Sequence, residues 1–81
     1  MVCSLKDLQP GQKCRIVKVG GAGELRKRIV EMGITAGKTV EIERVAPLGD
    51  PVEIIIMGYH LSLRRAEMAR ITVEPMEEHH T

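Results

Sequence analysis

Aromatic side chains are almost absent from this chain of 81 residues, which has no Phe, no Trp and a single tyrosine, Tyr59. Grooves for Pro-rich ligands and stacking platforms for single-stranded nucleic acid are both built from rows of aromatic side chains. The composition therefore disfavours both kinds of module. We expect this domain to bind its partners through aliphatic surface, charge or backbone.

A charge excess and a long apolar run are also missing. Twelve Lys and Arg residues face 11 Asp and Glu, a net charge of +1, whereas a nucleic-acid-binding domain usually has a clear basic excess. The longest uncharged apolar stretch, Ile54-Ile55-Ile56-Met57, is far shorter than the ~20 residues of a membrane span. The N-terminus lacks the apolar core of a signal peptide. We therefore expect a cytoplasmic protein with no nucleic-acid partner and no direct membrane insertion.

The length fits one small domain. We assign residues 1–75 to this domain and residues 76–81, which are mostly polar, to a flexible C-terminal tail. Two cysteines, Cys3 and Cys14, are expected to be free thiols because the cytoplasm is reducing.

The hydrophobic pattern predicts a β-rich chain with one inserted helix. The helix is expected over residues 24–32, where Leu25, Ile29 and Met32 form one apolar stripe and Gly33 suits a left-handed end. Within it, Glu24 and Arg28 have the spacing of an ion pair. Short helical turns are expected at 4–8 and 64–69. Strands are expected at residues 13–19, 39–46, 52–58, 60–63 and 71–73.

Five short strands and one helix favour an all-β fold with an inserted short helix, a small barrel closed by its last strand. Closure of the barrel removes exposed sheet edges, whose unpaired backbone groups would otherwise favour aggregation. The segment Gly20-Gly21-Ala22-Gly23 precedes the helix, so its amides are placed to hold an anion. No βαβ unit follows, and we interpret the segment as a tight strand-to-helix turn.

The candidate metal ligands are Cys3, His60, His79 and His80. They show neither Cys-x-x-Cys nor His-x-x-x-His spacing, so a site for Fe²⁺ or another divalent transition metal is an alternative rather than the main prediction. No arrangement of nucleophile and base typical of catalysis occurs, so we do not expect an enzyme.

Leu48 stands at the tip of a loop that is flanked by Pro47 and Pro51, where a leucine is usually exposed. The alternative is that Leu48 folds back over the barrel mouth. The following strand is expected to be apolar on both faces, with Ile55 and Met57 pointing outward. Either a partner covers these residues or they form an adhesive surface.

Several ordered segments together resemble one family, the ferrous iron transport protein A (FeoA) family. The resemblance extends over about residues 4–74, and one departure from it is Met68, where a smaller residue is expected. The segments that carry it are Ser4-Leu5-x-Asp7-Leu8-x-Pro10-Gly11, Leu25-x-x-Arg28-Ile29-x-x-Met32-Gly33-Ile34, Thr35-x-Gly37, Val45-Ala46-Pro47-Leu48-Gly49-Asp50-Pro51 and Leu61-Ser62-Leu63-Arg64-x-x-Glu67-Met68-Ala69.

The resemblance implies an SH3-like barrel and a small cytosolic accessory of ferrous iron uptake. It also implies the membrane permease FeoB, which has a GTP-hydrolysing domain on its cytosolic side, as the partner. Similar domains form the C-terminal part of repressors of the diphtheria toxin repressor type. This chain has no room for their DNA-binding part, so we expect the stand-alone form.

These observations lead to three hypotheses. The first is docking on FeoB, or on another copy of this chain, with modulation of the permease. Its expected contact residues are Leu48, Ile55, Met57, Arg26 and Lys27. The second is an Fe²⁺-binding chaperone or sensor, and the third is a small-barrel nucleic-acid binder. The first requires no cofactor.

Overall fold

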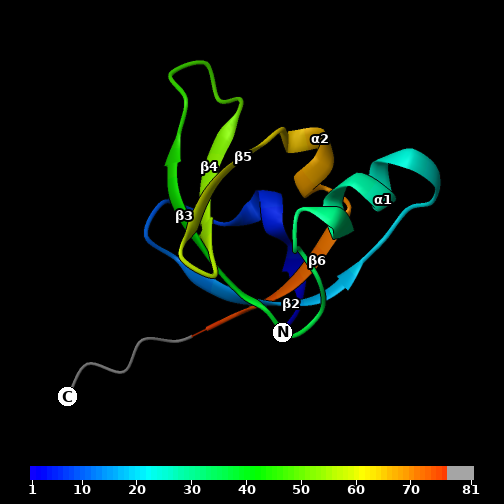
Figure 1. Cartoon of the computed structure of the whole chain (residues 1–81). Coiled ribbons are helices and arrows are strands. Elements are labelled where there is room, and N and C mark those ends of the chain that lie inside the picture. Colours follow the sequence, from blue (N-terminus) through cyan, green and yellow to red (C-terminus); the bar gives the residue numbers. More distant parts are fainter. Residues whose placement is uncertain (77–81) are drawn as a thin grey trace.

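A computed structural model describes residues 1–76, which form a curled antiparallel sheet with two short α-helices on one side (Figure 1). In this part of the chain, no helix has both the length and the apolar character needed to cross a membrane. The strands are β1 (Cys3–Ser4), β2 (Lys13–Val19), β3 (Thr39–Val45), β4 (Val52–Ile56), β5 (Tyr59–Leu63) and β6 (Ile71–Pro75). The helices are the 3-10 turn η1 (Leu5–Asp7), α1 (Gly23–Glu31) and α2 (Arg65–Met68).

The strands are hydrogen-bonded in the order β1-β6-β2-β3-β4-β5, with every neighbouring pair antiparallel. The last strand, β6, therefore lies between β1 and β2. The expected all-β, SH3-like barrel with an inserted helix is confirmed. It has one strand more than predicted, because Cys3–Ser4 pairs with Val73 and Thr72 although it is too short to produce a sequence pattern. Over residues 1–76 no ladder joins β1 to β5, so the barrel is partly open.

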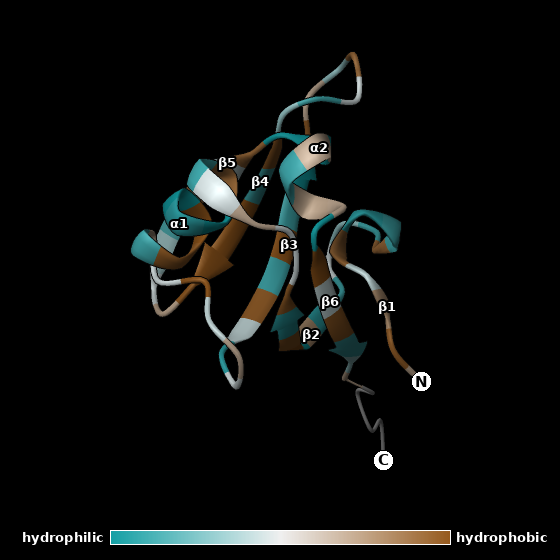
Figure 2. Ribbon diagram, turned by 90° about the vertical axis from the view of Figure 1, so that its right-hand side faces the viewer, coloured by the Kyte–Doolittle hydropathy of each residue, from teal (hydrophilic) through white to brown (hydrophobic). Residues whose placement is uncertain are grey.

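The core is built without aromatic residues, and the one tyrosine, Tyr59, is 64% exposed. Alternate residues of β4 and β6 point inward, and the ribbons show hydrophobic and hydrophilic residues alternating along the strands (Figure 2). In β2 and β3 a bulge interrupts this alternation. Met68 is buried, so the residue that departs from the family pattern fills a core position. The core residues are Leu5, Leu8, Cys14, Ile16, Val19, Ile29, Ile34, Val40, Ile42, Val52, Ile54, Ile56, Leu63, Met68, Ile71 and Val73.

Helix α1 ends where the sequence predicts, because Gly33 adopts a φ of 91°. The backbone N–H of Ile34 then donates to the carbonyl of Ile29 (3.3 Å), and both of these side chains are buried. A Cβ atom at position 33 would lie 2.9 Å from the terminal carbon of Met57. A glycine is thus needed twice here, for the left-handed backbone and for the close approach of the β4–β5 turn.

Strand β4 is shorter than predicted, so the prediction that Ile55 and Met57 share its outer face is wrong. The strand ends at Ile56, and Met57 (φ 50°) and Gly58 (φ 81°) form the turn to β5. Only Ile55 and Glu53 therefore point outward from β4, and Met57 lies beyond the end of the strand.

Helix α2 connects distant parts of the chain through one buried carboxylate, Glu67. Its Oε1 accepts from the backbone N–H of Arg64 (2.8 Å), and its Oε2 lies 3.0 Å from Arg28 Nη2 on α1. The predicted pairing of Arg28 with Glu24 is not among the ion pairs of residues 1–76, because Arg28 turns to Glu67 instead. The Ser4 hydroxyl donates to the carbonyl of Met68 (3.2 Å), which attaches α2 to the N-terminal segment as well.

We expect Glu67→Ala to lower the free energy of unfolding by about 2 kcal/mol, because the substitution removes acceptors from two donors at the base of α2. Arg28→Ala should cost less than about 1 kcal/mol, since the Arg28 side chain is largely exposed. Urea unfolding of the two variants measures both values. Equal losses would show that the ion pair, rather than the cap of α2, carries the stability.

Candidate partner-binding surfaces

Leu48 is 97% exposed, so the alternative in which it folds back over the barrel mouth is wrong. It lies in the β3–β4 loop, which stands away from the body of the domain with hydrophobic colour at its tip (Figure 2). Within the loop, the N–H of Gly49 donates to the carbonyl of Ala46 (2.8 Å), and that of Ala46 to the carbonyl of Pro51 (3.0 Å). The loop is therefore a hydrogen-bonded turn that presents an apolar tip.

Arg65 fixes this loop to the rest of the domain. Its backbone N–H donates to Asp50 Oδ1 (3.0 Å), and its Nε donates to the carbonyl of Gly49 (2.5 Å). Its Nη1 reaches the carbonyl of Lys6 beside η1 (3.4 Å). One arginine thus joins the loop, α2 and η1. Sequence reasoning missed Arg65, since no local pattern links it to partners 15 residues away or more.

A shallow pocket of about 360 Å³ lies at the base of the same loop. At its rim, Arg44 Nε lies 2.5 Å from Glu53 Oε2, and this hydrogen bond lowers the pKa of the Glu53 carboxyl below its usual value. The lining is otherwise aliphatic. The lining residues are Arg44, Val45, Ala46, Pro47, Pro51 and Glu53. The loop therefore combines an exposed apolar tip with an apolar base that has a charged border.

The other predicted contact residues do not form one patch with Leu48. Ile55 is half-buried on the outer face of β4, between Glu41 of β3 and His60 of β5 in the ladder. Met57 is half-exposed at the opposite end of β4 from the loop. Arg26 and Lys27 are exposed on α1, which lies on another side of the domain (Figure 1).

Two of the predicted metal ligands, Cys3 and His60, lie in the described residues, on β1 and β5. Cys3 is half-buried in β1, and His60 Nδ1 lies 2.8 Å from Glu43 Oε1 on the outer face of the sheet. His79 and His80 lie outside the described residues. Within residues 1–76, no three His, Cys, Asp or Glu side chains come together as a metal-binding group.

Cys14 is a buried core thiol. Burial, with a smaller effect of the neighbouring Cys3, raises the pKa of Cys14 to about 11. Its thiol is therefore protonated at neutral pH, which makes it a weak nucleophile and a poor metal ligand.

Comparison with known proteins identifies the family. The sequence model of the FeoA domain matches residues 3–75. The chain belongs to the FeoA family. It is 50% identical over 70 residues to a fusion of Fe(2+) transport protein A with the Fe(2+) transporter FeoB from Porphyromonas gingivalis. The match covers 86% of this chain and only 8% of the fusion protein. The FeoA family is associated with ferrous iron transport.

Solved structures agree with this assignment. A FeoA-like protein from Clostridium acetobutylicum superposes with a TM-score of 0.90 at 35% identity, covering 99% of this chain and 93% of that one. FeoA from Stenotrophomonas maltophilia, described as an SH3 domain protein and complexed with zinc, superposes with a TM-score of 0.79 and covers 89% of each chain. At 21% identity the second likeness shows the fold alone.

The raised pKa of Cys14 predicts a pH dependence of stability. Between the value of 9.0 for a free thiol and about 11 in the folded chain, the unfolded thiol loses its proton while the folded one keeps it. The free energy of unfolding contributed by this group is therefore complete below pH 9 and is lost as the pH rises through this window. Urea unfolding at about pH 8 and about pH 10.5 should show a larger loss for the wild type than for Cys14→Ala. Equal losses would contradict this prediction.

Proposed function

We propose that this FeoA-family chain is a cytosolic accessory of ferrous iron uptake that docks on the FeoB permease and modulates it. The observation that carries the proposal is Leu48, an almost fully exposed leucine held on a hydrogen-bonded loop by Arg65. The fusion of the two proteins in the Porphyromonas relative supports FeoB as the partner, because fusion keeps two domains at high effective concentration.

The loop has the composition of a small interface, with an apolar centre and a polar rim. Burial of a leucine side chain contributes about 1.5–3 kcal/mol, which corresponds to roughly a tenfold to hundredfold change in affinity. The Arg44–Glu53 pair borders the aliphatic base and supplies polar contacts there. Leu48 therefore acts as the anchor, and its surroundings exclude water from it.

The remaining predicted contacts act separately from this anchor. Arg26 and Lys27 orient the partner at a distance, because unscreened charge extends about 8 Å at physiological salt. Ile55 and Met57 form secondary contacts only if the partner extends along β4. Substitutions at these four positions should therefore weaken docking less than substitutions at Leu48.

We expect Leu48→Asp to weaken the retention of FeoB by about tenfold or more, because it places a charge in the apolar centre of the interface. The measurement is capture of detergent-solubilised, full-length FeoB from the same organism on the immobilised chain over a concentration series. Val2→Asp is the matched control, since Val2 is also an exposed aliphatic residue and should bind like the wild type. Equal retention by the Leu48→Asp variant would remove the loop from the interface.

Arg65→Ala should weaken docking only through Leu48. In a double-mutant cycle, we expect Arg65→Ala to reduce FeoB retention by about threefold to tenfold in the wild type and to have little effect when Leu48→Ala is already present. Amide hydrogen exchange at Gly49 should become faster in Arg65→Ala and stay unchanged in Arg64→Ala, the control. Additive losses in the cycle would show that Arg65 contacts the permease independently.

A further inference from the structure

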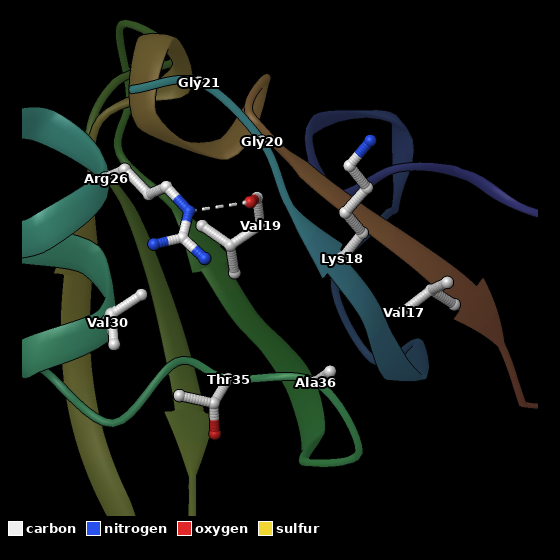
Figure 3. A pocket seen from close by; sticks show the side chains of 9 residues that line it. All are labelled: Val17, Lys18, Val19, Gly20, Gly21, Arg26, Val30, Thr35 and Ala36. Carbon is white, nitrogen blue, oxygen red and sulfur yellow. Dashed lines mark hydrogen bonds between the residues drawn. The ribbon is translucent and has the colours of Figure 1, made fainter. Parts of the chain in front are cut away.

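A second concave surface lies between β2 and α1, away from the Leu48 loop. It is a groove of about 550 Å³. In Figure 3, Arg26 and Val30 of α1 form one wall and Val19 on β2 forms the other, with Thr35 and Ala36 along the lower side and Gly20 and Gly21 at the upper end. Val17 and Lys18, which precede Val19 on β2, complete the lining, and the Lys18 side chain extends on the other side of β2 from Arg26 (Figure 3). Of the residues predicted to contact FeoB, Arg26 alone lines this groove, and none of the metal candidates in the described residues does.

The groove follows a part of β2 that has no neighbouring strand on one side. Pairing with β3 covers Lys13–Arg15 and ends there. The turn before β3 then covers Ile16, whose N–H donates to the carbonyl of Lys38 and whose carbonyl accepts from Gly37, both at 2.8 Å. Beyond Ile16, this side of β2 meets no strand within residues 1–76, although β6 pairs with its other side up to Val19.

Arg26 occupies the open side of the strand. Its Nε donates to the carbonyl of Val19 at 3.3 Å, the dashed line in Figure 3. This distance is at the long end for an N–H···O hydrogen bond. A carboxylate would be a stronger, bidentate acceptor for the same guanidinium. An incoming acidic group would therefore take Arg26 and leave the Val19 carbonyl free to accept from another N–H donor.

Unpaired cations gather around this groove. Lys18 and Arg26 line it, and the Arg70 guanidinium lies against Gly21, where a Cβ would come within 3.0 Å of Arg70 Nη1. None of these three cations belongs to an ion pair in the described part of the chain.

None of the described residues that line the groove is acidic, although Glu24 and Glu31 lie on the same helix, α1. Glu43 and Glu53 face outward from β3 and β4, where they pair with His60 and Arg44. Lys18, Arg26 and Arg70 at the groove are therefore separate from the paired charges of β3, β4 and β5.

We propose that the groove between β2 and α1 binds an extended acidic segment of a partner protein. A carboxylate of the segment binds Arg26 and a second one binds Lys18. A backbone N–H of the segment donates to the freed Val19 carbonyl, so that the segment adds a short strand to β2. An apolar side chain between the two carboxylates packs against Val30 and Ala36. This binding mode needs no aromatic side chain, in agreement with the composition of the chain, and it is independent of docking through Leu48.

Two matched display libraries test this proposal. Both consist of peptides of about eight residues with random apolar positions, and the alternate positions carry Asp or Glu in one library and Lys or Arg in the other. We expect the acidic library alone to yield binders to the full-length chain. Their affinity should fall about tenfold or more in Arg26→Glu and on raising the salt from about 50 mM to about 500 mM. Binding should be unchanged in Leu48→Asp, so failure here is distinguishable from failure of FeoB docking.

Arg26→Gln, which removes the charge with a smaller change, serves as the second variant, and circular dichroism checks that both variants fold. With the best acidic peptide, amide signals of Val17–Val19 and Ala36 should shift in nuclear magnetic resonance spectra. The proposal is overturned if the acidic library yields no binder, or if neither Arg26 substitution lowers the affinity of its binders. It is also overturned if the shifted amide signals map to another surface. Binding of a single-stranded oligonucleotide in the groove in place of the peptides would also overturn it.

Discussion

The four-residue helix α2 holds the distant parts of this small domain in place. Arg65 at its start is hydrogen-bonded to the β3–β4 loop and to the carbonyl of Lys6. Glu67 closes its first turn and reaches across to Arg28 on α1. Met68 fills the core beneath it. Because these contacts come from three of the four residues of one short element, the position of the Leu48 loop and that of α1 depend on the same turn of helix.

An aliphatic core with little aromatic content explains where binding can occur. The inward residues of the sheet are nearly all Leu, Ile and Val, and the lone aromatic side chain, Tyr59, is largely exposed. An SH3-like fold usually binds peptides through an aromatic groove. In this chain, the features left for recognition are an apolar loop tip and a groove bordered by cations. The loop tip would bind through hydrophobic burial and the groove through charge. The two surfaces can therefore serve different partners.

Local signals allowed much of the fold to be predicted. The bounds of β2 follow from its β-branched residues, and the end of α1 just before Gly33 follows from the glycine. For Leu48 the sequence left exposure and folding back over the barrel mouth as alternatives, and the structure shows it exposed. The missed features depend on contacts between distant segments. Strand β1 exists only because β6 lies beside it, and Arg28 prefers the buried Glu67 to its local partner Glu24.

For the candidate surfaces too, local features could be predicted from the sequence and contacts between distant segments could not. Single residues such as Leu48 and Arg26 could be selected from their local context, but their grouping could not. Met57 was placed on the face of Ile55 by strand parity, which fails because the strand ends at Ile56. Arg65 and the open side of β2 appear only when the loop, the helices and the sheet are assembled, since their partners lie 15 or more residues away or on another element.

We propose that Leu48 enters an interface with FeoB while α2 holds its loop. The most direct measurement is methyl nuclear magnetic resonance of the chain with labelled leucine methyl groups, titrated with full-length FeoB in nanodiscs. We expect the Leu48 signal to shift or broaden first, while the signals of the buried Leu5 and Leu63 keep their positions. An unchanged Leu48 signal under conditions in which FeoB binds the chain would contradict it.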